Sequence, residues 1–274
     1  MIVDFHSHTS ASDGTLTSGE LVAAMAARKV EIFSVTDHDT LRAYEVLRPD
    51  GVDCAEIGPA TLVPGIEINT TYHGNEVHIL GYGFNLGASK LRNVIEENRR
   101  SRGERAQKMV EMLNRAGHEI SIEAVRAEGT ADAPLGRPHV AKALVRNGTT
   151  RDVASAFRDF LSPGGPGYVP SHHILPRDAI AAVANSGGVP VLAHPGRLKD
   201  ETLIEELAAA GLVGLEVFYP THGAAQVERF RDIAAQFGLV MTAGSDFHDP
   251  RYNARGVGME VNADDIRPFL DLIL

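Results

Sequence analysis

The sequence predicts an α/β protein in which a parallel sheet, covered by helices, closes into a barrel. Short apolar segments rich in β-branched residues alternate with segments of helical pattern, which is typical of strand–helix–strand units. Roughly seven such strands in a chain of this length favour a closed barrel over an open sheet. One long stretch without strand signals interrupts the alternation and predicts a helical insertion.

The N-terminal part of the chain predicts an early helix and four strands. Thr17 and Glu20 have the spacing of a capping box and precede the apolar Leu21, so we expect a helix to begin there. The expected strands are brief and rich in β-branched residues, and they cover residues 2–5, 32–35, 62–68 and 77–82.

The C-terminal part of the chain returns to the same alternation. Apolar segments predict strands over residues 189–193, 215–218 and 240–243. Helical patterns cover residues 178–185, 201–210 and 224–237.

The stretch between these two parts has a different pattern. It contains apolar residues at helical spacing and a basic run between Arg99 and Lys108, and it closes with a stiff loop rich in proline and glycine. We therefore expect a barrel built from residues 1–85 and 171–274, with residues 86–170 forming a helical insertion over one end of it.

The composition excludes several classes of function. Lys and Arg number 26 against 36 Asp and Glu, a net charge of −10, so the basic face needed to grip duplex DNA is not expected. A signal peptide and a bilayer-spanning segment of ~18–20 apolar residues are both absent from the sequence pattern, so no membrane partner is expected. The single cysteine, Cys54, excludes an intrachain disulfide and favours the cytoplasm as the compartment.

Histidines and carboxylates stand at the ends of the expected strands, where α/β barrels carry their catalytic groups. His6 and His8 are two positions apart on extended chain, so both imidazoles point to one side, as half of a metal site would require. Glu67 lies within an apolar strand, where a carboxylate is costly unless it is paired or metal-bound. The other candidates of this kind are Asp13, His38, His78, His194, Asp246 and His248.

Each of these residues also has a plainer explanation. Isolated histidines such as His73 are more often surface or core residues, and His78 alone is compatible with a core histidine bonded to the backbone. The succession of imidazoles and carboxylates at consecutive strand ends nevertheless predicts one shared metal site.

Four motifs occur in order along nearly the whole chain: Asp4-Phe5-His6-Ser7-His8, Thr36-Asp37-His38-Asp39, Ala193-His194-Pro195-Gly196-Arg197 and Gly244-Ser245-Asp246-Phe247-His248. They resemble the motifs of the PHP (polymerase and histidinol phosphatase) superfamily. The resemblance implies a metal-dependent phosphoesterase with a distorted (β/α)7 barrel. Within the superfamily, the insertion and the His-Pro-Gly-Arg element are most similar to 3′,5′-nucleoside bisphosphate phosphatases, AMP phosphatases and related 5′→3′ exoribonucleases.

The resemblance also implies two to three divalent metal ions, with His194, Glu67 and Asp246 central to catalysis. The implied ligands are His6, His8, Glu67 and Asp246 for one ion, Glu67 as a bridge with His78 and His194 for the second, and Asp13, His38 and His248 for the third. Imidazole and carboxylate ligands without thiolate suit Mn²⁺, which we expect, or Zn²⁺ or Fe²⁺. Asp4, Asp37 and Asp39 either orient the ligating imidazoles or cap strand ends.

Substrate contacts are expected outside the metal ligands. Arg197 follows His194 by three positions, and its planar guanidinium suits phosphate oxygens, although a surface arginine is the plainer explanation. By resemblance, a second and non-reacting phosphate would be held by Arg102, Arg105, Arg137, His139 and His222. A basic run on a helix is otherwise a solvated face.

We therefore expect a phosphatase that acts on a nucleotide, removing the 3′-phosphate of a 3′,5′-bisphosphate (pAp to AMP). The alternatives are a 5′→3′ exoribonuclease on short RNA, a histidinol-phosphate phosphatase, and a non-catalytic metal-binding PHP module. The expected partner is thus a small nucleotide or a short RNA, with no prediction of the oligomeric state.

Overall fold

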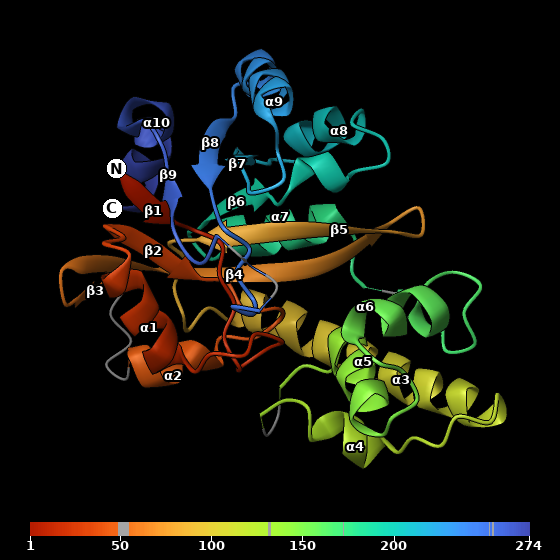
Figure 1. Cartoon of the computed structure of the whole chain (residues 1–274). Coiled ribbons are helices and arrows are strands. Elements are labelled where there is room, and N and C mark those ends of the chain that lie inside the picture. The colour runs from red at the N-terminus through yellow and green to blue at the C-terminus, as the bar shows by residue number, and fades with distance from the viewer. Residues whose placement is uncertain (49–54, 131–132, 172, 252, 254) are drawn as a thin grey trace.

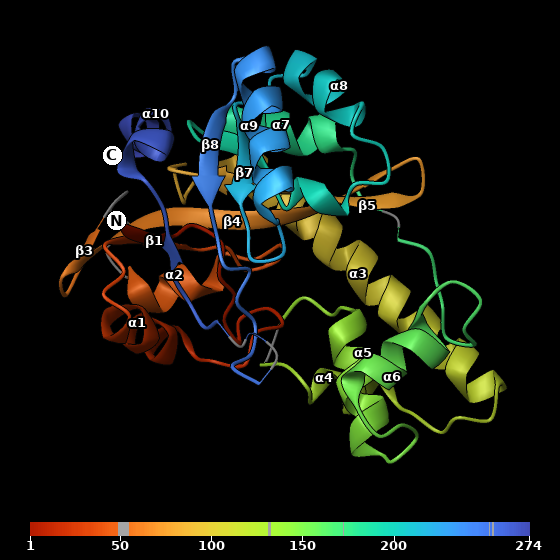
Figure 2. The same cartoon turned by 45° about the horizontal axis from the view of Figure 1, so that its top comes forward.

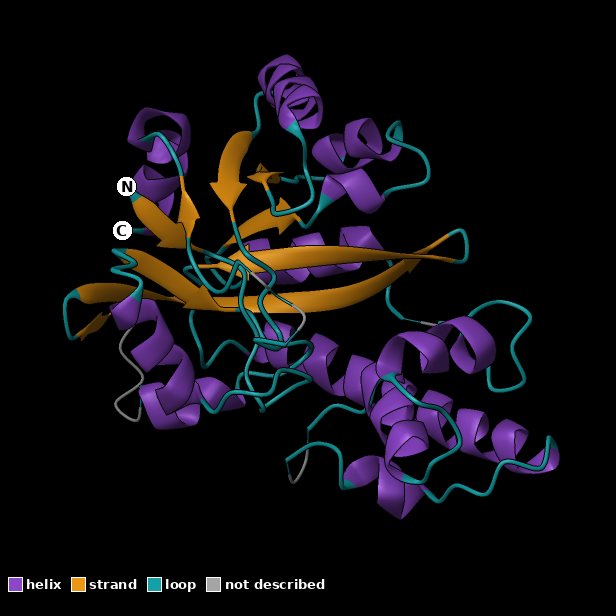
Figure 3. Cartoon of the chain, in the orientation of Figure 1, coloured by secondary structure: helices purple, strands orange, loops and turns teal. Residues whose placement is uncertain are grey.

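The structure is a computed structural model that describes residues 1–274 except 49–54, 131–132, 172, 252 and 254, so Cys54 lies outside the described residues. One mixed sheet has the strand order β8-β7-β6-β5-β4-β2-β1-β9, with β3 paired to β4 (Figures 1 and 3). The strands are β1 (Ile2–Asp4), β2 (Ile32–Val35), β3 (Ala55–Ile57), β4 (Ala60–Tyr72), β5 (Asn75–Tyr82), β6 (Val189–Leu192), β7 (Gly214–Phe218), β8 (Val240–Ala243) and β9 (Met259–Glu260).

The chain after β1, the second strand from one end of this order, meets β8 at the other end, so the sheet is nearly closed into a barrel. Just beyond β1, the backbone N–H of Phe5 donates to the carbonyl oxygen of Ala243 in β8 at 2.9 Å. Ser7 and Phe247 continue this contact as a parallel bridge. The predicted α/β barrel is confirmed.

The expectation of a parallel sheet is wrong at β5, which runs antiparallel to both β4 and β6. The chain turns back at His73 and Gly74, whose φ angles of 47° and 77° lie in the left-handed region. A tight turn between β4 and β5 leaves no room for the helical crossover that parallel strands need. Parallel pairing is kept within β1, β2 and β4 and within β6, β7 and β8.

Each of the seven expected strands overlaps an observed one, whereas β3 and β9 were not expected. These two strands have three and two residues, too short for any period in the sequence to reveal them. The expected capping box is also present, because Thr17 Oγ1 accepts from the N–H of Glu20 and Glu20 accepts from the N–H of Thr17.

Helices cover the barrel and form a separate layer beside it (Figures 1 and 2). The helices are α1 (Ser18–Ala27), α2 (Arg42–Leu47), α3 (Ser89–Arg115), α4 (Ile122–Arg126), α5 (Arg137–Arg146), α6 (Val153–Ala156), α7 (Pro176–Ala184), α8 (Leu203–Ala209), α9 (Ala224–Phe237) and α10 (Ala263–Ile273), with short turns at Phe157–Leu161 and Pro195–Arg197.

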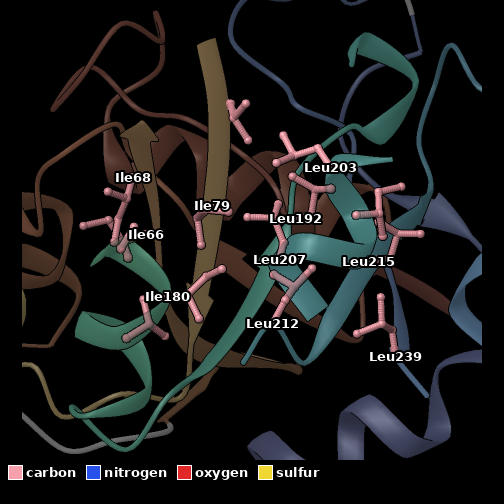
Figure 4. Close-up of a cluster of buried hydrophobic side chains, with 14 of the residues drawn as sticks. Ile66, Ile68, Ile79, Ile180, Leu192, Leu203, Leu207, Leu212, Leu215 and Leu239 are labelled. Carbon is pink, nitrogen blue, oxygen red and sulfur yellow. The ribbon is translucent and has the colours of Figure 1, made fainter. Parts of the chain in front are cut away.

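Three groups of buried apolar side chains include residues of barrel strands, and two of these groups include residues of β5 and β6. Inside one, Phe269 of α10 meets the ring of Phe5 edge-on at 4.9 Å and that of Tyr82 at 5.1 Å. The other packs the barrel strands against the helices and includes Ile79 and Ile180 (Figure 4). Burial of such side chains contributes about 1.5–3 kcal/mol each, which fixes the barrel that carries the site.

The helices of the middle stretch bury their apolar sides against one another. Met109 and Leu113 of α3 pack with Val140 and Leu144 of α5 in a group distinct from those of the barrel. Figures 1 and 2 show these helices beside the sheet, joined to it through α3. The bounds of the insertion, residues 86–170, stay a prediction.

No helix within the described residues is both long and apolar enough to cross a membrane.

Candidate active site

The predicted polar residues converge at one end of the barrel. The loops after β1, β2, β6 and β8 bring side chains there from four distant parts of the chain. The β4–β5 hairpin adds Glu67 and His78. Glu67 pairs with Leu80 and Asn69 pairs with His78, so these four side chains lie on one face of the hairpin.

Glu67 lies at the centre of this cluster and is 1% exposed. Its Oε2 is 3.1 Å from Nε2 of His6 and 3.2 Å from Nε2 of His8. Its Oε1 is 2.7 Å from Nδ1 of His78 and 3.1 Å from Nε2 of His194. The two oxygens of one carboxylate therefore face two different sets of imidazoles, which is the arrangement of a bridging ligand.

Among the described residues, three overlapping groups have potential ligand atoms within 4.8 Å of one another: His6, His8, Glu67 and Asp246; His38, Glu67 and His78; and His8, Asp13, His38 and His248. The first group has the members that the sequence resemblance implies. The other two differ from the implied sets, because His38 is also grouped with Glu67 and His78, and His8 is also grouped with Asp13, His38 and His248. His194 joins the cluster through its contact with Glu67. The assignment of ligands to individual ions stays a prediction.

The unsatisfied atoms of the cluster fit divalent cations. Nε2 of His6, both ring nitrogens of His8 and Oε2 of Glu67 are buried without a hydrogen-bond partner. Ligand atoms about 2.0–2.2 Å from one shared ion lie about 3.0–3.4 Å apart. The separations of 3.1–3.3 Å from His6 and His8 to Glu67 and Asp246 fall in that range.

The carboxylates of the cluster are ionised at neutral pH. Burial raises the pKa of Glu67, but the imidazoles of His38 and His6 hold it well below its usual range. Burial likewise opposes ionisation of Asp13 and Asp246, and neighbouring histidines, foremost His248 and His6 respectively, keep both pKa values well below normal. Three anionic groups are thus available to hold cations.

Glu216 of β7 is a member of the site that the sequence prediction missed. It is fully buried, and its Oε1 is 2.9 Å from Nδ1 of His6, while its Oε2 accepts from the backbone N–H of His194 at 2.7 Å. This contact fixes the His6 ring so that Nε2 faces the cluster. The signal existed in the sequence, since Glu216 is a carboxylate inside an apolar strand, as Glu67 is.

The acidic residues beside the ligands hold loops in place. Asp4 accepts from the backbone and hydroxyl of Ser245 at 2.9 and 2.7 Å, and Asp37 accepts from Thr9 and Ser12. Of the two roles expected for these residues, the contacts fit the capping of strand ends. Asp39 differs, because it accepts from the amide of Asn69 at 2.7 Å, and that amide lies 3.1 Å from Nδ1 of His38.

The backbone is strained where the ligands meet. His194, Asp246 and Asp39 have φ angles of 31°, 50° and 49°, in the left-handed region that favours glycine. Each such residue costs on the order of 1–3 kcal/mol, which the surrounding contacts must offset. A Cβ on Gly244 would lie 2.2 Å from Cβ of His6, so only glycine allows this approach.

A cavity of about 230 Å³ lies over the cluster, lined by Glu67, His78 and His194 on one side and by residues of α3 and α5 on the other. A second hollow of about 530 Å³ adjoins it. The two share Glu76, Arg105, Arg137 and Arg197.

The predicted phosphate-binding arginines reach this cavity, and each already has protein partners. Arg105 and Arg137 both bind Glu76, at 3.2 and 2.5 Å, and the guanidinium groups of this pair keep the pKa of Glu76, which burial would raise, at about 2. Arg102 is 6% exposed and is 3.1 Å from Asp39.

Arg197 lines the same cavity and hollow and contacts a carboxylate of the cluster. It is 3.2 Å from Oδ2 of Asp246 and sits over the ring of Tyr219, whose hydroxyl donates to the same oxygen at 2.8 Å. The sequence prediction missed Tyr219 and Glu76, because neither belongs to a motif.

His139 and His222, also predicted to contact substrate, are not in the wall of the cavity as the described residues form it. His139 is fully buried, and burial lowers its pKa to about 4. His222 has Nδ1 2.9 Å from the carbonyl oxygen of Val217 and accepts from the N–H of Gly196 at 3.3 Å. Both rings are therefore committed to protein contacts.

Comparisons with known proteins agree with this geometry, although no family model matches the chain. The chain is 33% identical to a 3′,5′-nucleoside bisphosphate phosphatase of Chromobacterium violaceum, over 97% of this chain and 93% of that protein. It is also 33% identical to the 5′-3′ exoribonuclease Rnm of Escherichia coli, over 91% and 86%. A phosphoribosyl 1,2-cyclic phosphate 1,2-diphosphodiesterase of Eggerthella lenta is 33% identical over 96% and 100%.

Solved structures give the same result. A Chromobacterium violaceum protein described as an amidohydrolase, with bound sulfate and no metal, has a TM-score of 0.85 at 30% identity, covering 98% of this chain and 95% of its own. A Bifidobacterium adolescentis protein described as a metal-dependent phosphoesterase has a TM-score of 0.82 at 30% identity, covering 99% and 96%.

The fold, the cluster and these relatives define an α/β-barrel, metal-dependent phosphoesterase. The chain belongs to the PHP superfamily, as its four motifs predict, and it is an enzyme. The alternative of a non-catalytic module is thereby set aside.

Proposed function

We propose that this enzyme removes the 3′-phosphate of a 3′,5′-nucleoside bisphosphate, converting pAp to AMP. The observation that carries the proposal is the pair Arg105 and Arg137, which lines the cavity over the cluster and offers two guanidinium groups to a second, non-reacting phosphate. A relative of 33% identity bears this activity in its name.

The donor set supports resident divalent cations, with Mn²⁺ as the proposed ion and Zn²⁺ and Fe²⁺ as alternatives. Bound cations would supply Lewis-acid activation of water and neutralisation of phosphoryl charge. The proposed ligands are His6, His8, Asp13, His38, Glu67, His78, His194, Asp246 and His248.

The chain's own side chains would bind and orient the substrate around this centre. Arg105 and Arg137 would turn from Glu76 towards the 5′-phosphate, and Arg197 lies close enough to Asp246 to reach the reacting phosphate. Hydrolysis forms a bond between the water oxygen and phosphorus, breaks the bond between phosphorus and the 3′-oxygen, and transfers a proton from the water to that oxygen. The products are inorganic phosphate and the 3′-hydroxyl, and no covalent phospho-enzyme is needed.

A second candidate, 5′→3′ exoribonuclease activity on short RNA, is favoured by the adjoining hollow. This hollow continues past Arg105 and Arg137 and is also lined by Tyr72, Tyr168 and Lys199. Aromatic rings stack on bases and lysine binds backbone phosphate, so nucleotides beyond the first would find contacts there. A relative of 33% identity is named for this activity.

Turnover on a panel of substrates tests the proposal. The panel contains pAp, AMP, histidinol phosphate and a 5′-phosphorylated RNA of a few nucleotides, each assayed with protein purified in Mn²⁺ and with the bound ions counted. We expect the highest kcat/KM with pAp. A higher value with the RNA would replace the proposal by the second candidate, and a preference for histidinol phosphate would exclude both.

The proposed setting is the cytoplasm, with a small polyanion as partner. A net charge of −10 leaves a local positive patch at Arg105 and Arg137, which suits a small nucleotide better than duplex DNA.

A further inference from the structure

The helices beside the barrel hold the loop that carries Asp13. Three side chains donate to backbone carbonyl oxygens of this loop: Thr130 Oγ1 to Ser10 at 2.8 Å, His139 Nε2 to Ser12 at 3.0 Å, and Lys142 Nζ to Asp13 at 3.1 Å. On its other side the loop is held by Asp37, which accepts from the hydroxyl of Ser12 at 2.6 Å. Asp13 thus sits between the barrel and α5.

The contacts of His139 define its tautomer. The backbone N–H of Gly136 donates to Nδ1 at 3.1 Å, so the ring proton is on Nε2 and is donated to the carbonyl oxygen of Ser12. The ring is fully buried, and both nitrogens are used. His139 therefore has no capacity left for a substrate phosphate and instead links α5 to the loop.

The same helix also faces the substrate cavity. Arg137, two positions before His139 in the first turn of α5, lines both the cavity and the adjoining hollow. Successive residues of a helix are about 1.5 Å apart along its axis and move together. A displacement of α5 caused by an anion at Arg137 therefore reaches the Asp13 loop through His139 and Lys142.

We propose that His139 and Lys142 are positioning residues for the cation group of Asp13, His38 and His248, and that α5 couples occupancy of this group to anion binding at Arg137. The inference rests on the proposed function for the role of Arg137. Because coupling between two binding sites is reciprocal, an anion at Arg137 tightens cation binding at Asp13 by the same factor as the cation tightens anion binding.

Titration of the metal-free protein with Mn²⁺, followed by calorimetry and by counting bound ions, tests the first part. His139→Leu and Lys142→Met are expected to weaken one ion by roughly 10–100-fold, the usual cost of removing a group that supports a metal ligand, and to leave the others unchanged. His139→Gln keeps a donor near the position of Nε2 and should restore affinity. Arg146→Met is the matched control, since Arg146 lies on α5 but is 71% exposed and binds Glu128.

Three outcomes would overturn this part: wild-type affinity for every ion in His139→Leu, equal weakening of all ions, or no rescue by His139→Gln. Thermal unfolding of the metal-free variants shows whether each one folds. If His139→Leu does not fold, Lys142→Met and Thr130→Val, which each remove one donor to the loop, carry the same test.

Repeating the titration at increasing sulfate concentration tests the coupling. Sulfate is a tetrahedral dianion, so this readout does not depend on which phosphoester is hydrolysed, and it can fail while the pAp assay succeeds. We expect sulfate to tighten one Mn²⁺ in the wild type by about fivefold or more. Arg137→Met should retain every ion but lose the sulfate effect. A sulfate effect that persists in Arg137→Met, or is absent from the wild type, would overturn the coupling.

Discussion

The polar groups of the site differ between its barrel end, which is the cluster around Glu67, and its helical side, which is formed by α3 and α5. At the barrel end, Nε2 of His6, both nitrogens of His8 and Oε2 of Glu67 are buried without a hydrogen-bond partner. On the helical side, Arg102, Arg105 and Arg137 all contact a carboxylate of the protein. The buried polar atoms of the barrel end therefore lack partners within the protein. The arginines of the helical side have carboxylate partners, which they can exchange for a substrate phosphate.

This difference indicates that the barrel end tolerates few substitutions, whereas the arginines of the helical side can change partners. Buried polar atoms without a hydrogen-bond partner are costly, so these atoms of the barrel cluster are suited to binding cations. When no substrate is present, Arg105 and Arg137 bind the carboxylate of Glu76 in place of a phosphate. Substitutions at the barrel end should therefore reduce activity more than substitutions on the helical side.

Glu67→Gln should disrupt cation binding and catalysis at the barrel end. The change removes the negative charge that faces five imidazoles, so we expect a loss of kcat/KM well above 100-fold and fewer bound ions. Glu260→Gln, an exposed glutamate on β9, is the control. Full turnover of the metal-saturated Glu67→Gln variant would remove Glu67 from the proposed ligands.

Glu216→Gln should weaken the same end without destroying it. The substitution loosens the His6 ring, and affinity for one ion should fall by roughly 10–100-fold. Excess Mn²⁺ should then restore kcat, which it would not do for Glu67→Gln. A variant that stays inactive at saturating metal would show that Glu216 acts on more than cation affinity.

Arg137→Met and Arg105→Met should affect the helical side alone. Loss of a charge-assisted hydrogen bond to phosphate is worth about 1.5–3 kcal/mol, so KM for pAp should rise about 10-fold or more while kcat changes little. Steady-state kinetics of both variants beside Arg146→Met check this. If kcat fell with KM unchanged, the contrast between the two ends would not hold.

His139 should give the smallest effect, as a dependence of stability on pH. Burial lowers its pKa from 6.5 to about 4, so the unfolded chain binds a proton over a pH range in which the folded protein does not. Above pH 6.5 the ring is neutral in both states and has no effect on the free energy of unfolding. As the pH falls from 6.5 towards 4, protonation of the unfolded chain lowers that free energy. Between pH 7.5 and 5.5 the loss is about 1 kcal/mol. Denaturant unfolding of the wild type and His139→Gln at both pH values measures it, and an equal pH dependence in the two proteins would contradict it.

The sequence predicted the barrel end better than the helical side, for a physical reason. Predicted ligands such as His6 and Asp246 stand at strand ends in motifs, and the structure brings them together. His139 and Arg137 both look like anion binders in the sequence, and only the contacts of His139 with Ser12 and Gly136 separate the two.

The antiparallel hairpin was beyond the sequence argument for a related reason. The apolar patterns of β4 and β5 would be the same in parallel and antiparallel strands. The turn at His73 and Gly74 decides that β5 runs antiparallel to β4. Glu216 was missed although its signal matched that of Glu67. The pattern identifies a costly carboxylate but not the neighbour that makes it tolerable.

The β4–β5 hairpin restricts where residues can be inserted or deleted in this part of the chain. Glu67, Asn69, Glu76 and His78 share one face of a two-stranded ribbon whose side chains alternate between faces. Loss or gain of a single residue within either strand would rotate Glu67 or His78 to the opposite face, away from the other ligands. Within this hairpin, a change in length by one residue is therefore expected at the tip around His73 and Gly74 rather than within the strands.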